Sequence, residues 1–197
     1  MIDVGDLAPD ALLSAPLLDR DGSAAPLRAH LPPGPALLLF LRHFGCVGCS
    51  RQVEQLTPRV WELRDLGVTS VFIGNGRPEH LRGFVERHAL ADKEVVLLTD
   101  PELRAYAALD LERSLWSALR PKALFGQLKA FAAGFRGGRI EGDVEQQGGA
   151  ALLDDARRIV WLRRAHYTAD EVDGSDVVAA AMRLAVARRR QEGGLVL

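Results

Sequence analysis

The chain has 197 residues, 48% of them hydrophobic, which suits one medium-sized domain with a substantial core. Disordered and collagen-like proteins are thereby excluded. Lys and Arg total 25 against 26 for Asp and Glu, so the formal net charge is -1. A chain so close to neutral has no overall field to attract nucleic acid or an anionic membrane, so any basic site must be local, and no nucleic-acid partner is expected.

The chain is also expected to remain in the cytoplasm. Its first residues, Met1 to Asp6, lack the basic start and the apolar run of a secretory signal. The longest apolar run, Pro35 to Leu41, is far shorter than the roughly 20 residues that cross a bilayer. This run therefore predicts a buried strand, and no membrane span is expected.

Strand and helix signals alternate along the first half of the chain. Short apolar runs on either side of a turn signal at 19–23 predict an N-terminal hairpin that ends by about Arg28. The elements predicted next are a strand at 36–42, a helix from about 46 to 67, a strand at 68–73, a helix at 78–88 and a strand at 95–98. This alternation predicts an α/β fold with a parallel or mixed sheet.

The second half is predicted to begin with a helical segment from about 101 to 135. Residues 111–140 carry six basic side chains and one acidic one, which favours a helical insertion with its charges in water. A membrane-surface helix and a lid over an anionic substrate are the alternatives. Strands at 149–153 and 157–163 follow, and a last helix is capped by Asp173 or Ser175.

The two cysteines, Cys46 and Cys49, form a Cys-x-x-Cys unit between a predicted strand and helix. At the start of a helix, this spacing places the two Cα atoms on the order of 5 Å apart, within the range of a disulfide. The positive end of the helix favours the thiolate of Cys46, which is therefore the candidate nucleophile. Cys49, one turn further in, is the candidate for resolving an oxidised Cys46.

A zinc site and plain structural cysteines are the alternatives for this pair. A structural zinc site needs two more Cys or His ligands at similar spacing, whereas the five histidines are scattered and no second pair exists. A position between strand and helix in an α/β pattern is typical of a thioredoxin-like redox site. Redox chemistry is therefore favoured, and it requires neither a bound cofactor nor a metal.

Three segments resemble the peroxiredoxin-like branch of the AhpC/TSA family, which includes the prostamide/prostaglandin F synthases. They are Leu39 to Arg51, the predicted insertion at 115–135, and Gly142 to Gly149. The resemblance spans nearly the whole chain and implies a single thioredoxin-like domain over 1–197, with a central mixed sheet flanked by helices, an N-terminal hairpin and a helical insertion at about 101–135. It also implies thiol-based reduction, with electrons from a thioredoxin- or glutathione-type donor.

Two positions depart from ordinary peroxiredoxins, which carry a proline and a threonine seven and three residues before the reactive cysteine. Leu39 and His43 stand there, so the hydroxyl that orients a peroxide is missing. His43 is a candidate for stabilising the thiolate as imidazolium or for moving its proton, and a histidine bonded to nearby backbone is the alternative. Arg42 and Arg51 are further candidates for supplying positive charge, although strand alternation predicts that Arg42 points to the face opposite His43.

Gln147 and Gly148 are the candidate substrate-binding residues. They precede a predicted strand at the place where thioredoxins carry a cis-proline facing the disulfide. The backbone of Gln147 is expected to bond an incoming thiol or peptide, and a plain turn is the alternative.

The sequence thus predicts an enzyme, a thiol-disulfide oxidoreductase or peroxiredoxin-like peroxidase that acts on a small oxidant or a disulfide. A non-catalytic redox sensor or partner-binding protein that uses the same disulfide is the alternative. The oligomeric state is left open, a homodimer included.

Overall fold

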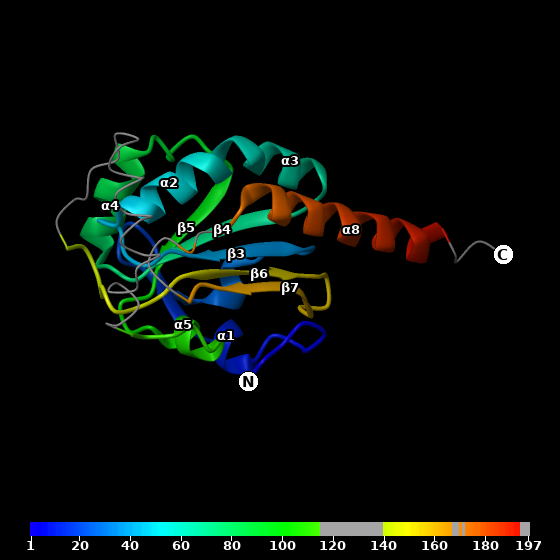
Figure 1. Cartoon of the computed structure of the whole chain (residues 1–197), viewed down its shortest axis with the longest axis horizontal. Helices are drawn as coiled ribbons and strands as arrows, with labels where there is room; N and C mark the ends of the chain where they lie inside the picture. The colour runs from blue at the N-terminus through cyan, green and yellow to red at the C-terminus, as the bar shows by residue number, and fades with distance from the viewer. Residues whose placement is uncertain (115–139, 167–169, 171, 194–197) are drawn as a thin grey trace.

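The computed structural model describes residues 1–114, 140–166, 170 and 172–193. Within them one mixed sheet has the strand order β2-β1-β5-β4-β3-β6-β7 (Figure 1). The strands are β1 (Pro16–Leu18), β2 (Ala24–Pro26), β3 (Ala36–Phe40), β4 (Thr69–Gly74), β5 (Val95–Thr99), β6 (Gly149–Leu153) and β7 (Ile159–Arg164). The helices are α1 (Asp10–Leu13), α2 (Val47–Leu56), α3 (Val60–Asp65), α4 (Pro78–Arg87), α5 (Arg104–Ala108) and α8 (Gly174–Gly193).

The centre of the sheet is parallel and its margins are antiparallel. Strands β3, β4 and β5 run in the same direction, whereas β6 and β7 return antiparallel beside β3. The predicted N-terminal hairpin is confirmed by the antiparallel pairing of β1 with β2. These pairings confirm the predicted α/β fold with a mixed sheet.

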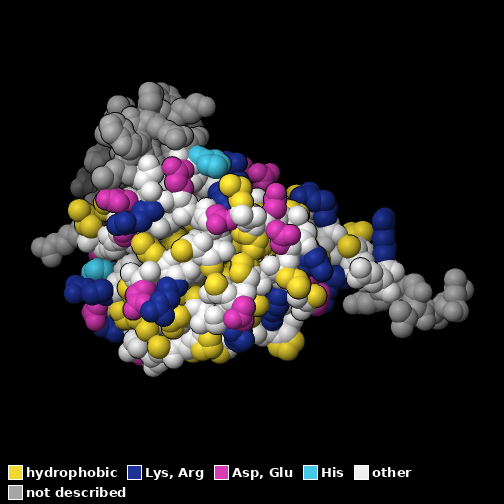
Figure 2. Space-filling view, turned by 90° about the horizontal axis from the view of Figure 1, so that it is seen from below, with side chains coloured by type: hydrophobic (Ala, Val, Ile, Leu, Met, Phe, Trp, Pro, Cys, Tyr) yellow, Lys and Arg dark blue, Asp and Glu magenta, His cyan; other side chains and the backbone are white. Residues whose placement is uncertain are grey.

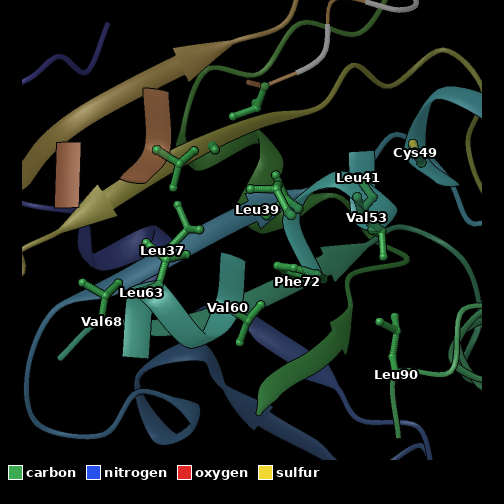
Figure 3. Packing of buried hydrophobic residues seen from close by; sticks show 14 of the residues in the cluster. Leu37, Leu39, Leu41, Cys49, Val53, Val60, Leu63, Val68, Phe72 and Leu90 are labelled. Carbon is green, nitrogen blue, oxygen red and sulfur yellow. The ribbon is translucent and has the colours of Figure 1, made fainter. Parts of the chain in front are cut away.

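Both faces of the central strand β3 are buried, which explains its unbroken apolar sequence. Leu37 and Leu39 pack beneath α2, α3, α4 and α8, as Figure 3 shows in part. Leu38 and Phe40 point to the other face, which α1 and α5 cover. The strand is thereby fixed between two cores, and the loop that follows it starts from a rigid position.

Two predicted elements differ from the structure near the site. The strand predicted at 36–42 ends at Phe40. The helix predicted from 46 to 67 is interrupted by a 3-10 turn at Thr57–Arg59, because Pro58 has no N–H for a continuous helical ladder.

The helix predicted from 101 is also shorter than expected. In the described part of that segment only Arg104–Ala108 is helical, and Asp110 then takes a positive φ of 53°. Arg113 forms an isolated antiparallel bridge with Gln146 instead. The remainder of the predicted insertion, 115–135, lies outside the described residues.

The last helix begins as predicted, with Asp173 as its cap. The Asp173 carboxylate accepts the Ser175 N–H at 2.8 Å, and its carbonyl accepts the Val177 N–H at 3.2 Å. The hydrogen bonds from Ser175 lower the pKa of Asp173. Helix α8 then extends beyond the sheet toward the C-terminus (Figure 1).

The face seen in Figure 2 mixes hydrophobic side chains with charges of both signs. This is the side on which α1 and α5 cover the sheet, and it agrees with the near-zero net charge of the chain. Among the described helices, none is both long and apolar enough to span a membrane.

Candidate functional site

The loop that joins β3 to α2, residues 41–46, carries the candidate site and is anchored in the core. Its first residue, Leu41, donates its N–H to the Ile73 carbonyl at 2.8 Å. The buried Tyr106 hydroxyl lies 2.6 Å from the Leu41 carbonyl oxygen. The Phe44 ring fills the space over Gly74, where a Cβ atom would lie 2.2 Å from the ring's Cζ. Glycine at this strand end is therefore required for the loop to pack as it does.

Asn75, directly after β4, links this loop to the segment around Asp143. Its side-chain amide donates to the carbonyl of Arg42 and, at 3.2 Å, to that of Asp143. Its Oδ1 accepts the Asp143 N–H at 2.9 Å. Gly142 has a φ of +130°, and a Cβ atom there would lie 2.1 Å from that Oδ1. Asn75 was missed by the sequence analysis, although an asparagine at the carboxyl end of a central parallel strand is a usable signal.

The two cysteines occupy the amino end of α2 as free thiols. Cys46 is the residue before the first helical turn, and its carbonyl accepts the Ser50 N–H at 3.1 Å. Cys49 is one turn further in and lies beside Leu41 and Val53 at the end of the buried cluster (Figure 3). Cys46 is 8% exposed and Cys49 3%. Both thiols are thus shielded, with Cys46 nearer to solvent.

The surroundings of the two sulfur atoms separate their acidities. A hydrogen bond from Cys49 lowers the pKa of Cys46 well below its usual range, and the charge of Arg42 acts in the same direction against the effect of burial. The same hydrogen bond, together with burial, raises the pKa of Cys49. Cys46 is therefore the group that ionises first, in agreement with the helix-end argument.

Arg42 approaches both cysteines, contrary to the prediction from strand alternation. Its Nη1 donates to the Sγ of Cys46 at 3.6 Å, and its backbone N–H donates to the Sγ of Cys49 at 3.2 Å. Its Nη2 donates to the Val144 carbonyl at 2.9 Å. The prediction was wrong because β3 ends at Phe40, so the alternation of the strand does not extend to residue 42.

His43 is buried in the same loop, 9% exposed. Burial lowers its pKa from 6.5, although the nearby Cys46 charge acts in the opposite direction. The imidazole is therefore neutral at neutral pH. Among the described residues, none forms a hydrogen bond with its Nδ1.

A narrow pocket opens onto the cysteines and includes one of the two candidate substrate-binding residues. The residues around it are Arg42, Cys46, Gly48, Cys49, Gln52, Gly148, Gly149, Ala165, Asp170 and Val172. The space available to the centre of a water-sized molecule is about 20 Å³, which suits about one water. The structure thus brings Gly148 to the cysteines.

Gln147, the other candidate, is not among the residues around this pocket. Its N–H donates to the Glu112 carbonyl at 2.9 Å, and its carbonyl accepts the Gln146 side-chain amide at 2.9 Å. Its own side-chain amide donates to the Glu145 carbonyl at 3.0 Å. Both of its backbone groups are therefore engaged within the chain.

In the part of the chain that the structure describes, no three His, Cys, Asp or Glu side chains come together as metal ligands. The arrangement of the two thiols and Arg42 is suited to thiol chemistry. In such chemistry a stabilised thiolate attacks an oxidant, and a second thiol, protonated until then, loses its proton and attacks the oxidised sulfur.

A family model described as "AhpC/TSA antioxidant enzyme" matches residues 55–167, more than half of the chain. The chain belongs to the AhpC/TSA family. The match confirms the family to which the sequence motifs pointed. It begins after Cys49, so the roles of the two cysteines depend on their own geometry.

Curated relatives of this AhpC/TSA chain are similar over most of their length. Peroxiredoxin-like 2C of Homo sapiens is 28% identical over 173 residues, which cover 82% of this chain and 75% of the relative. The thioredoxin-like protein AAED1, chloroplastic, of Arabidopsis thaliana is 25% identical over 186 residues, which cover 90% of this chain and 74% of the relative.

Solved structures of similar shape confirm the thioredoxin-like fold of this AhpC/TSA member. Peroxiredoxin Q of Xanthomonas campestris superposes with a TM-score of 0.65 at 17% identity and covers 91% of this chain and 96% of its own. Peroxidoxin BcpB of Mycobacterium tuberculosis superposes with a TM-score of 0.66 at 16% identity and covers 93% of this chain and 99% of its own.

Proposed function

We propose that this protein is a peroxiredoxin-like thiol oxidoreductase that cycles Cys46 and Cys49 between dithiol and disulfide. The observation that carries the proposal is the Arg42 guanidinium, 3.6 Å from the Sγ of Cys46 at the amino end of α2. A positive charge and a helix terminus both stabilise a thiolate, which is the reactive form of cysteine. His43 and Gly148 complete the candidate site from the loop and from the segment before β6.

The proposed cycle has three steps. The Cys46 thiolate attacks one oxygen of a hydroperoxide, the O–O bond breaks, and the departing oxygen takes up a proton and leaves as water or alcohol. Cys49 then displaces hydroxide from the Cys46 sulfenic acid, which forms the disulfide and releases water. One dithiol of the thioredoxin type, or two monothiols of the glutathione type, supply two electrons, reopen the disulfide and are themselves oxidised to a disulfide.

A disulfide substrate enters the same cycle through a mixed disulfide with Cys46, from which Cys49 releases a thiol. The size of the pocket favours a small oxidant over a folded protein. The cycle needs a compartment that holds a thiol reductant, and the cytoplasm meets this requirement.

The test is a steady-state screen of hydrogen peroxide, an organic hydroperoxide and a small disulfide, with thioredoxin and its reductase or with glutathione as donor. We expect turnover with at least one oxidant, its loss in Cys46→Ser, and an intramolecular disulfide as the main oxidised product. The proposal is contradicted if Cys46 reacts with each of these oxidants no faster than free cysteine does. Mainly covalent dimer after oxidation would also contradict it.

A redox sensor is the second candidate, and a specific contact favours it. Arg42 bonds both the Sγ of Cys46 and the carbonyl of Val144, so loss of the thiolate on disulfide formation removes one of its two partners. In a sensor, disulfide formation would proceed without turnover and would alter hydrogen exchange around Val144. Turnover with a donor system decides between the two functions.

A further inference from the structure

We propose that Asp170 accepts the proton of Cys49 when the disulfide closes. This inference rests on the proposed function and assigns a role to a group outside the cysteine loop. Asp170 lines the same pocket as both cysteines, and its side chain is 6% exposed. Among the described residues around the pocket, it supplies the one carboxylate.

Cys49 needs such an acceptor. In the reduced protein a hydrogen bond to Cys46 and burial raise its pKa. Burial still favours the protonated thiol once Cys46 is a sulfenic acid, whereas only the thiolate attacks sulfur efficiently. The other charged group around the pocket is Arg42, whose guanidinium keeps its protons. His43 is not among the residues around the pocket.

The carboxylate of Asp170 is held in a fixed orientation. One oxygen lies 2.6 Å from Nη2 of Arg163 on β7, and the other accepts the His166 N–H at 2.9 Å. Each carboxylate oxygen has two acceptor positions, so these bonds leave capacity for a proton. The pocket that both residues line has room for about one water, and we infer that such a water carries the proton from the thiol to the carboxylate.

The step balances when Asp170 both takes and returns the proton. The Cys49 thiol gives its proton to the Asp170 carboxylate, and the resulting thiolate attacks the Sγ of the Cys46 sulfenic acid. The S–S bond forms as the S–O bond breaks, and the departing hydroxide takes the proton from Asp170 to leave as water. Cys49 is oxidised, Cys46 is reduced from the sulfenic state, and Asp170 ends as a carboxylate.

The experiment separates oxidation of Cys46 from closure of the disulfide. Reduced Asp170→Asn protein is mixed with one equivalent of hydrogen peroxide or of an organic hydroperoxide, whichever oxidises the wild type faster. Sulfenic acid is trapped with dimedone, and the disulfide is followed by mass spectrometry. We expect sulfenic acid to form at the wild-type rate and closure to slow by about a hundredfold at neutral pH.

The pH profile provides a readout that a merely structural role would not change. In Asp170→Asn, closure should depend on the ionisation of Cys49 alone, so its rate should rise more steeply with pH above neutrality than in the wild type. The charged and titratable groups beside this carboxylate are Arg163 of β7, which pairs with it, and Arg42, Cys46 and Cys49, which line the same pocket. Asp170→Glu, which keeps a carboxylate, should restore a large part of the rate.

Asp155→Asn is the matched control, because Asp155 pairs with Arg188 at 2.9 Å and is not among the residues around the pocket. It should close the disulfide at the wild-type rate. Closure in Asp170→Asn within about twofold of wild type, with normal sulfenic acid formation, would overturn the inference and leave the proposed function standing. A wild-type Cys46 that reacts with neither hydroperoxide nor small disulfide any faster than free cysteine would overturn both.

Discussion

Nη1 of Arg42 lies 3.6 Å from the Sγ of Cys46. Arg42 lies in the loop after β3, and Cys46 ends that loop directly before α2. The contact pairs a permanent cation with the sulfur atom whose pKa is lowered. The site therefore carries a cation that does not depend on the protonation of a histidine.

Arg42→Gln should raise the pKa of Cys46, because the variant removes a charge that favours the thiolate. At neutral pH a smaller fraction of Cys46 would then be ionised, and we expect oxidation to slow by about tenfold. The measurement is the pH dependence of thiolate absorbance together with the rate of oxidation. Arg104→Gln, which removes an exposed arginine that pairs with Glu102, is the control and should match wild type.

Brief treatment of the reduced protein with iodoacetamide should modify Cys46 before Cys49. Cys46 has the lowered pKa and the greater exposure, whereas the pKa of Cys49 is raised. Mass mapping after limited reaction gives the order directly. Modification of Cys49 ahead of Cys46 would reverse the two proposed roles, and Cys46→Ser shows how slowly Cys49 reacts alone.

His43→Ala should affect oxidation at low pH and not at neutral pH. Burial lowers the pKa of His43, so the ring is neutral near pH 7 and takes up a proton only as the pH falls below about 6.5. The charge of the imidazolium then stabilises the Cys46 thiolate, and the variant loses this stabilisation. We expect rates within about twofold at about pH 7.5 and a growing deficit toward about pH 5. An equal deficit at both pH values would show that the charge of His43 is not the cause.

Gly74→Ala should destabilise the protein and disturb the cysteine loop. The added Cβ would lie 2.2 Å from Cζ of Phe44, so the buried ring or the strand must move. Overpacking of this kind costs about 1–3 kcal/mol of unfolding free energy, which urea unfolding of the reduced protein would measure.

Gly83→Ala is the matched control for this substitution. Gly83 lies within α4, and the nearest atom to its added Cβ is the flexible end of Arg87 at 3.3 Å. A helical glycine replaced by alanine is expected to gain about 0.5–1 kcal/mol. Equal losses in the two variants would contradict the argument from Phe44.

The sequence by itself determined the class of fold, the family and the pair of cysteines. Hydrophobic runs such as Leu37–Leu41 and the regular step of Val53, Leu56 and Val60 report local burial, which depends on neighbours a few residues away. The Cys-x-x-Cys spacing has the same local character, because one helical turn brings residues 46 and 49 together.

Only the tertiary structure decided what surrounds the sulfur atoms. Arg42 faces them because β3 ends at Phe40, and this end is set by pairing with β4 and β6. Asn75 and Asp170 come from segments far along the chain, so no local period marks them. Burial lowers the pKa of His43, and the hydrogen bond to Cys46 together with burial raises the pKa of Cys49. Burial is a property of the packed domain and of no single segment.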